Sequence, residues 1–459
     1  MAEASVPLMI VVNNYFANFV RVVLNHPLLI DMVMKKRFAY IITFTILCFC
    51  VACGSKGKKE EQIDREAELE HYFSGVSEIV TDSASPLIRA GGELATVIID
   101  VKDLNLHDAG TDFNLIKVIK LQTTRNNLIG SVDKLIYADS TFFILDRDMG
   151  KSIYSFDSEG NFIATIGFSG RGPEEYIEPT DIFYDEVARN VVVWDQFTHR
   201  FLSYSRSGEF IYSRGVPLRF LRCERVPGSE SIWCSHLTVN GGVDGVDGYN
   251  LISTDSLCSR VEALFDLNPL VMNYVPIGTN MRVLGNSLYY HPQFSDTIYK
   301  IDESVVSPSF LLDFKNIPAL PRNLMELCEG NYERFMEQFA SSAVAYFEND
   351  FLITDRNIYF EVNIGADVIT VCYPYSSEGA DNEVSVLMPN IYNLFRPDHC
   401  QACNLPWGNM QSCSYSNGNL YAAVNSSLIS LLTKEELSYL NLMDLDEDGN
   451  PVILVMQER

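Results

Sequence analysis

The chain has 459 residues, of which 47% are hydrophobic and 20% are charged, and its formal net charge is −26 at pH 7. This apolar content is sufficient for a large folded core, whereas the acidic balance argues against binding to nucleic acid, which favours a basic surface. The sequence also lacks the motifs of P-loop nucleotide binding, zincin catalysis, the serine-hydrolase nucleophile elbow and dinucleotide binding. It therefore predicts no cofactor.

The start of the chain has the features of an export signal. Residues 1–33 are apolar but irregular, and we interpret them as an over-extended start before Met34. Three basic residues then precede the apolar run Phe38–Val51, which is shorter than the ~20 residues that a membrane-spanning helix needs. The sequence therefore predicts a lipoprotein signal peptide over residues 34–52, with cleavage before Cys53 and acylation of Cys53. The alternative is a plain transmembrane anchor that begins within residues 1–33.

A lipid on Cys53 would place the protein on the outer membrane, facing either the periplasm or the cell surface. The residues that follow, 54–70, are small and charged, with too few apolar side chains to pack into a core. We therefore expect a tether over residues 53–90 and a folded domain over residues 91–459.

One pattern of four strand-like runs occurs twice between residues 134 and 216. Each run is rich in Ile, Val, Phe and Tyr, and turn residues separate the runs. Asp146 in the first copy aligns with Asp195 in the second, and Gly160 aligns with Gly208, so the period is roughly 50 residues. A four-stranded unit of this period is typical of a β-propeller blade, because blades arranged in a ring cover one another's faces.

The folded region accommodates about six or seven such blades. We predict six, because the third blade and the region after the fourth carry insertions. The predicted fold is all-β: a six-bladed β-propeller with four-stranded antiparallel blades and short helical insertions. One helix is expected over residues 331–340, where apolar side chains recur at helical spacing. Another is expected over residues 434–440, where Thr433 with Glu436 forms a capping box at the start of the helix.

Three further apolar runs lie outside the blades, at residues 95–101, 115–121 and 451–456. In a propeller, a strand from one terminus commonly completes a blade that begins at the other terminus. We therefore expect these N- and C-terminal strands to close the ring.

Three stretches of the sequence resemble known propellers. They are Ile-Tyr-Ser-Phe-Asp-Ser-Glu-Gly-Asn-Phe-Ile at 153–163, Gly-Arg-Gly-Pro-Glu-Glu-Tyr at 170–176, and Tyr-His-Pro-Gln-Phe-Ser-Asp-Thr-Ile-Tyr at 290–299. These stretches are similar to NHL-like and TolB-like repeats, and more closely to a family of uncharacterised six-bladed propeller lipoproteins from gut-type Gram-negative bacteria. The resemblance implies the six-bladed fold and a lipid-anchored location, but no particular activity.

Two stretches could be taken for metal sites, and we predict no metal at either. Residues 444–449 begin like a calcium loop, but Val455 stands where a bidentate Glu is needed, so a polar turn is expected. The other stretch comprises His399, Cys400 and Cys403, with Cys413 further on. It could hold a metal ion, form a disulfide or carry free thiols, and the pairing of the eight cysteines after Cys53 stays open.

The predicted topology brings several polar loops to one face of the ring. The link 168–177 joins two blades, and the loops after the second strand of the blades lie on the same face. Ligand sites of ring folds are expected at the mouth of the axial channel, where polar groups from several blades converge. The candidate ligand-binding residues on this face are Arg147, Asp148, Arg171, Glu174, Glu175, Tyr176, His199, Arg200, His291 and Gln293. The alternative is that the link only forms a turn and that Arg171 pairs with a neighbouring carboxylate.

The sequence favours a binding or interaction module, because no nucleophile, metal or phosphate motif is found. The partner would be a glycan, a peptide or a component of an outer-membrane uptake complex. The alternative is a glycan-processing hydrolase or lyase whose groups converge only in the folded ring, with Glu174, Glu175, His199 and His291 as candidates.

Overall fold

The computed structural model places part of the chain, which divides into two compact units, Met1–Arg65 and Glu66–Arg459. All described residues belong to the second unit. The predicted signal peptide and Cys53 lie outside them, so the lipoprotein assignment stays a prediction. None of the helices among these residues is long and apolar enough to cross a membrane. The described residues are 80–81, 94–100, 105–107, 113–216, 218–235, 246, 249–255, 260–266, 280–303, 305–321, 324–329, 331–335, 337–338, 344–364, 367–376, 384–387, 410–430 and 432–458.

The two copies of the repeat form two four-stranded antiparallel sheets, which confirms them as blades 1 and 2. Both copies need glycine at the same turn: Gly160 and Gly208 have φ of 86° and 81°. A Cβ on Gly160 would lie 2.2 Å from the Lys120 carbonyl oxygen, and one on Gly208 would lie 2.5 Å from that of Thr165. Blade 1 consists of β5 (Lys134–Ala138), β6 (Thr141–Asp146), β7 (Ser152–Asp157) and β8 (Phe162–Thr165), and blade 2 of β9 (Pro179–Asp185), β10 (Asn190–Asp195), β11 (Arg200–Tyr204) and β12 (Phe210–Gly215).

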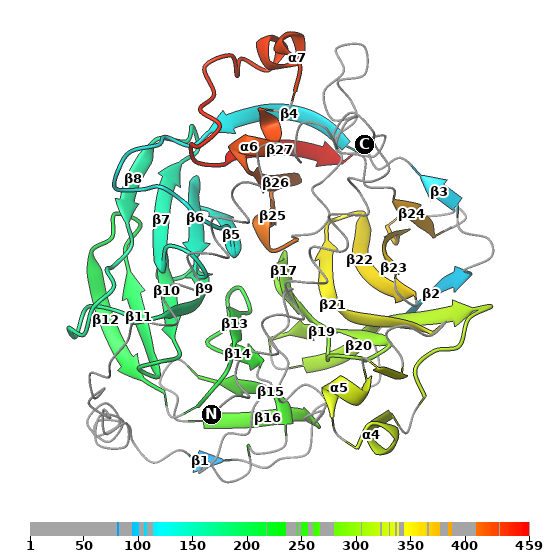
Figure 1. Ribbon diagram of the computed structural model, residues 1–459. Coiled ribbons are helices and arrows are strands. Elements are labelled where there is room, and N and C mark those ends of the chain that lie inside the picture. Colours follow the sequence, from blue (N-terminus) through cyan, green and yellow to red (C-terminus); the bar gives the residue numbers. More distant parts are fainter. Residues whose placement is uncertain are drawn as a thin grey trace, which may run out of the picture. The chain divides into compact units, whose positions relative to one another are not determined.

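Four more sheets complete a six-bladed β-propeller, as predicted, and Figure 1 shows the blades arranged around a common centre. Blade 3 consists of β13 (Arg222–Arg225), β14 (Ile232–Ser235), β15 (Tyr249–Thr254) and β16 (Arg260–Asp266), and blade 4 of β17 (Met281–Leu284), β18 (Ser287–Tyr290), β19 (Thr297–Asp302) and β20 (Val305–Lys315). Blade 5 consists of β21 (Ala345–Ile353), β22 (Asn357–Ile364), β23 (Asp367–Pro374) and β24 (Ser385–Leu387), and blade 6 of β25 (Cys413–Ser416), β26 (Asn419–Val424), β27 (Val452–Glu458) and β4 (Phe113–Lys120).

Ring closure uses only one of the two N-terminal runs that were expected to take part. Strand β4 pairs antiparallel with the C-terminal strand β27 and completes blade 6, which confirms that role. The expectation for residues 95–101 is wrong, because β2 (Ala95–Asp100) instead lies parallel to β20 as a fifth, outermost strand of blade 4. Strands β1 (Val80–Thr81, within the segment predicted as a tether) and β3 (Asn105–His107) add to β16 and β24 in the same parallel manner. The N-terminal segment thus covers the outer edges of three blades before it closes the fourth, which protects backbone groups that would otherwise be unpaired.

The hydrophobic core consists of layers between neighbouring blades. Each of six buried clusters combines residues from two adjacent sheets. For example, one cluster joins Phe143 of blade 1 to Val193 of blade 2, and another joins Ile453 of blade 6 to Phe142 of blade 1. The ring therefore buries both faces of every blade, which no single four-stranded sheet can do by itself.

Short helices lie in connections between blades and within blade 6. Within the range predicted as a helix, 331–340, α5 spans Tyr332–Phe335 and residues 337–338 are π-helical, and α4 (Leu324–Leu327) precedes this range. Phe335 is fully buried, and its ring lies 4.9 Å from that of Phe294 and 5.4 Å from that of Tyr346. It therefore packs against blades 4 and 5. Of the remaining helices, α6 (Ser426–Ile429) and η6 (Met410–Ser412) were not predicted, whereas α7 (Lys434–Tyr439) matches the prediction.

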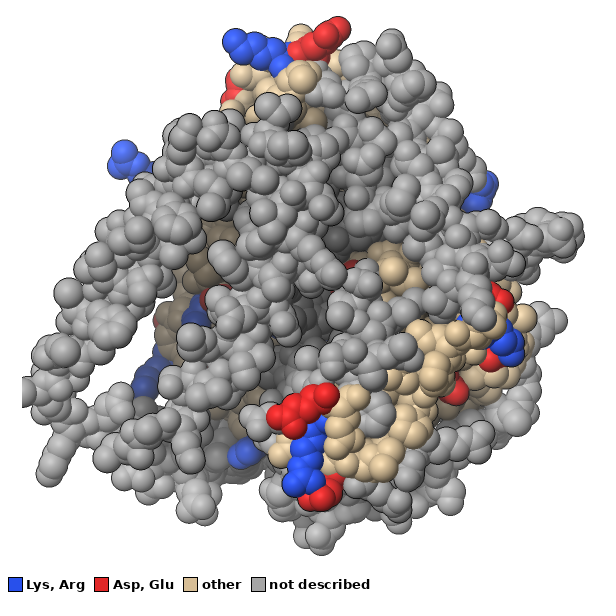
Figure 2. Space-filling model, turned by 45° about the vertical axis from the view of Figure 1, so that its right-hand side comes forward, with Lys and Arg blue, Asp and Glu red and all other residues tan. Residues whose placement is uncertain are grey.

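Charged side chains of opposite sign lie beside one another on the described part of the face in Figure 2. The ion pair between Arg334 Nη1 and Glu329 Oε1, at 2.5 Å, is one such case. Exposed pairs of this kind contribute little to stability.

Candidate functional site

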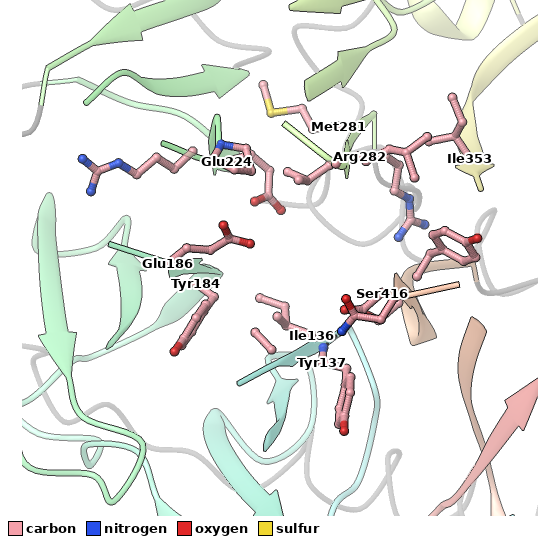
Figure 3. Close-up of a pocket in the computed structure, with 18 of the residues that line it drawn as sticks. Ile136, Tyr137, Tyr184, Glu186, Glu224, Met281, Arg282, Ile353 and Ser416 are labelled. Atoms are coloured by element: carbon pink, nitrogen blue, oxygen red, sulfur yellow. Dashed lines mark hydrogen bonds between the residues drawn. The ribbon is translucent and has the colours of Figure 1, made fainter. Parts of the chain in front are cut away.

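The inner strands of the six blades enclose a cavity on the propeller axis (Figure 3). Each sheet has its first strand at one edge, and β5, β9, β13, β17, β21 and β25 occupy these positions. Residues from all six blades line a cavity of about 380 Å³; they belong to the inner strands and to the turns that follow them. This volume lies at the small end of the range of ligand pockets.

A buried ion cluster joins three blades on this axis. Lys134 Nζ of β5 lies 3.2 Å from Asp181 Oδ1 of β9 and 2.5 Å from Glu224 Oε1 of β13. Burial by itself would lower the pKa of Lys134, but the two carboxylates outweigh it and raise that pKa. The ammonium group therefore stays charged and holds the inner strands of blades 1, 2 and 3 together.

A second cation ties the other half of the ring together. The Arg282 guanidinium of β17 donates to the carbonyl oxygens of Phe351 (2.8 Å), Cys413 (3.1 Å) and Met410 (2.6 Å), which belong to blade 5, to blade 6 and to η6 before blade 6. These bonds occupy all three guanidinium nitrogens, so Arg282 shapes the cavity wall and keeps little donor capacity for a ligand.

Two carboxylates remain directed into the cavity. Figure 3 shows the side chains of Glu186 and Glu224 turned toward the same open space. Glu186 follows β9 and is exposed, and no described residue forms a hydrogen bond or ion pair with its carboxylate. Burial raises the pKa of Glu224, and the charge of Lys134 opposes that rise. The cavity therefore offers acceptor oxygens to a ligand that carries hydrogen-bond donors.

The loop residues singled out in the sequence lie at the other end of the axis. Successive strands of a blade are antiparallel, so the loops after second strands and the links between blades face away from the turns that line the cavity. The cavity residues Lys134, Glu186 and Glu224 were therefore missed by the sequence prediction. Lys134 and Glu224 could have been found in the sequence, because each is a charged residue within the first strand of a blade.

Most residues of the link 168–177 have structural partners. Tyr176 is fully buried and its hydroxyl donates to the Ile166 carbonyl oxygen at 3.1 Å. Arg200, also buried, donates to the carbonyl oxygens of Pro173 (3.2 Å) and Glu175 (2.9 Å). These contacts fit the alternative that the link forms a turn, because they fasten it to blade 2.

The other polar members of this set differ in their surroundings. The Glu175 carboxylate accepts the Gly172 N–H at 2.8 Å, Arg171 and Glu174 are exposed, and His199 is buried beside Trp194. The loop of blade 1 brings Arg147 Nε within 2.8 Å of Asp148 Oδ1.

His291 and Gln293 are buried in the loop of blade 4. The His291 ring stacks on Phe347 at 3.7 Å, and its Nε2 is 3.0 Å from the Ser295 carbonyl oxygen. Burial lowers the pKa of His291 to about 3, so the ring is neutral near pH 7. Among the described residues, no partner is found for the Gln293 side-chain amide.

The cysteines that the structure describes are buried thiols, and Cys372 lies within β23. His399, Cys400 and Cys403 lie outside the described residues. Within the described part of the chain, no cluster of three or more metal-ligating side chains occurs.

Comparisons with known proteins give a family and a fold. The family model described as "Domain of unknown function (DUF4934)" matches residues 96–457. A solved structure of a Bacteroides fragilis NCTC 9343 protein named as exported is similar with a TM-score of 0.59 and 17% identity, over 80% of this chain and 99% of that chain. A member of the DUF4221 family from Bacteroides vulgatus has a TM-score of 0.45 and 12% identity, over 76% and 99% of the two chains. No curated protein matches the sequence.

Proposed function

We propose that this chain, which belongs to the family described as "Domain of unknown function (DUF4934)", is a binding module that holds a small ligand in its axial cavity. The observation that carries the proposal is the cavity of about 380 Å³, lined by all six blades, into which Glu186 and Glu224 point. Polar groups that converge from several structural elements on one cavity are a common feature of ligand sites.

The chemistry of the cavity favours a glycan as the ligand. Its two carboxylates accept hydrogen bonds, and sugars present several hydroxyl donors close together. Tyr137 and Tyr184 also line the cavity, but their rings stack on Tyr421 and Phe143 and point away from the open space in Figure 3, so it is the acceptor oxygens that favour a sugar. Lys134, Arg225 and Arg282 each contact carboxylates or carbonyl oxygens of the protein, so the described lining offers no cation that would favour an anionic ligand.

A glycan-processing enzyme is the second candidate, and one observation favours it. Two carboxylates in unequal environments, one buried with a raised pKa and one exposed, are the arrangement that glycosidases use as acid and base. However, Glu224 lies 2.5 Å from the Lys134 ammonium, which stabilises the carboxylate and opposes its use as a proton donor. Binding is therefore the better supported function.

Replacing Glu186 with Gln is expected to weaken glycan binding roughly tenfold or more, because the amide presents donors where the ligand needs an acceptor. A glycan array identifies the ligand, and titration calorimetry compares the variants. Glu209→Gln is the matched control, since Glu209 is exposed at the outer turn of the same blade. Equal affinity of both variants, or no bound glycan, would contradict the proposal. Cleavage of a bound glycan would support the enzyme instead.

We also propose that the protein is an extracytoplasmic lipoprotein. The pattern of residues 34–53 supports this, as does the name of the similar Bacteroides fragilis structure. Mass spectrometry of the mature chain is expected to find Cys53 as an acylated N-terminus, and Cys53→Ala should abolish the modification. A mature chain that retains residues 34–52 without lipid would exclude the assignment.

A further inference from the structure

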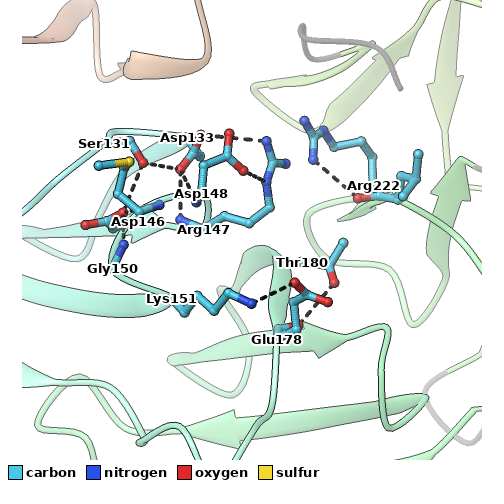
Figure 4. A network of polar contacts seen from close by, with 12 residues as sticks. Ser131, Asp133, Asp146, Arg147, Asp148, Gly150, Lys151, Glu178, Thr180 and Arg222 are labelled. Atoms are coloured by element: carbon cyan, nitrogen blue, oxygen red, sulfur yellow. Dashed lines mark hydrogen bonds and ion pairs between the residues drawn. The ribbon is translucent and has the colours of Figure 1, made fainter. Parts of the chain in front are cut away.

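Two arginines meet at the end of the axis opposite to the cavity. Arg147 follows β6 in the loop of blade 1, and Arg222 is the first residue of β13 in blade 3. Figure 4 shows their guanidinium groups directed toward one another across the space between the two blades. Two cations in this arrangement repel each other unless negative charge lies between or beside them.

Arg222 lacks the partners that a buried arginine needs. Its exposed fraction is 6%, and its side chain makes one long hydrogen bond, 3.4 Å, to the Leu221 carbonyl oxygen. Among the described residues, no carboxylate forms an ion pair with it and no acceptor is found for its Nε–H. Burial, together with the charge of Arg147, lowers the pKa of Arg222 despite Asp181. A guanidinium has five N–H donors, and leaving them unpaired in the interior is costly.

Two carboxylates whose charge acts on Arg222, Asp133 and Asp181, already serve other groups. Asp133 Oδ2 accepts from Ser131 Oγ at 2.6 Å and from the backbone N–H groups of Arg147 and Asp148. Asp181 binds Lys134 through Oδ1 and the Cys223 N–H, at 2.8 Å, through Oδ2. The described residues therefore leave donor capacity on Arg222 for a further group.

Arg147 is well placed to share such a group with Arg222. Its Nε lies 2.8 Å from Asp148 Oδ1 and its Nη2 lies 3.6 Å from Asp133 Oδ1, which fixes the guanidinium without saturating it. Its side chain is 19% exposed, so the site can be reached from solvent.

We propose that Arg147 and Arg222 form a binding site for an oxyanion, the carboxylate or phosphate group of a ligand. Planar guanidinium groups bind both kinds of oxyanion in a bidentate manner, and two of them from different blades would hold it from two sides. The site is separate from the axial cavity and stands independently of the glycan proposal. The net charge of −26 repels anions at long range, but physiological salt screens this beyond about 8 Å. Recognition then depends on the two arginines.

The test is titration calorimetry of the full chain with inorganic phosphate and with acetate, at matched ionic strength in sodium chloride. At least one of the two anions is expected to bind, and which one binds identifies the class of ligand. Arg222→Gln should weaken binding roughly tenfold or more, because it removes the charge and the bidentate donors. Arg222→Lys should also bind the anion weakly, since lysine keeps the positive charge but lacks the planar pair of N–H donors.

Arg189→Gln is the control, because Arg189 is 66% exposed and pairs with Asp139 on the surface. Thermal unfolding gives a second readout, in which a bound anion raises Tm for the wild type and the control but not for Arg222→Gln. An equal rise in all three would reflect the general stabilising effect of phosphate and would overturn the proposal. Absence of binding by both anions would also overturn it. If Arg222→Gln fails to fold, Arg147→Gln in the loop provides the same comparison.

Discussion

Replacing both Phe113 and Ile119 with alanine is expected to lower the free energy of unfolding by about 5–10 kcal/mol, which is comparable with the whole stability of a typical domain. Both side chains belong to β4, the strand that closes the ring on β27, and both are buried. Phe113 packs in the layer between blades 5 and 6, and Ile119 packs in the layer between blades 6 and 1. The two losses should add, because the residues lie at opposite ends of the strand.

Chemical denaturation followed by circular dichroism measures this loss. Ile116→Ala is the matched control, since Ile116 lies on the same strand with 56% of its surface exposed, and it should change stability by less than about 0.5 kcal/mol. If the double variant unfolds at the same denaturant concentration as the control, β4 does not close the ring in solution.

Replacing Asp195 with alanine is expected to cost about 3–5 kcal/mol of stability. This carboxylate is fully buried at the end of β10. It accepts the N–H groups of Ile177 (2.8 Å), Phe197 (3.0 Å) and Thr198 (3.3 Å) and the Thr198 hydroxyl (2.8 Å). It thus fastens the link that enters blade 2 to the loop of that blade, and its removal leaves several buried donors without acceptors.

Thermal and chemical unfolding measure the effect of this change. Asp157→Ala is the control, because Asp157 accepts backbone N–H groups of Glu159 and Asn161 at a turn that faces solvent. Water replaces the lost acceptor there, so a cost of about 1 kcal/mol is expected. Equal losses of stability at the two positions would show that burial does not increase the stabilising effect of the hydrogen bonds to Asp195. Asp146 occupies the equivalent place in blade 1, where it accepts the N–H groups of Gly130 and Gly150, so the two repeated aspartates share one structural role.

The family assignment adds no activity to these structural conclusions. Fold alone does not determine what a propeller binds, so the proposals depend on the particular groups on the axis. The axial cavity and the arginine pair lie at opposite ends of the same set of inner strands. Binding of a glycan and binding of an anion can therefore be tested separately, and failure of one leaves the other intact.

The sequence by itself determined the two repeated blades, because each of them is a local structure. Hairpins join strands that are neighbours in the chain, and their turn residues and alternating apolar side chains lie within one repeat. The apolar run at 115–121 was correctly assigned to ring closure, because a strand outside the repeats needs a partner elsewhere in the ring. The run at 95–101 has the same alternation, and the sequence contains nothing that distinguishes an outer fifth strand from a closing one. Only the structure showed that β2 lies against β20.

The tertiary structure alone decided which charges meet on the axis. Lys134, Asp181 and Glu224 lie in three different blades, and their contacts depend on the closure of the whole ring. The same holds for Arg147 and Arg222, of which the sequence analysis identified only the first. The residues of the link 168–177 stood out in the sequence because tight turns and buried links also require polar and glycine residues. Inner-strand charges were less conspicuous, because a strand pattern shows which side chains alternate but not which of the two faces borders the axis.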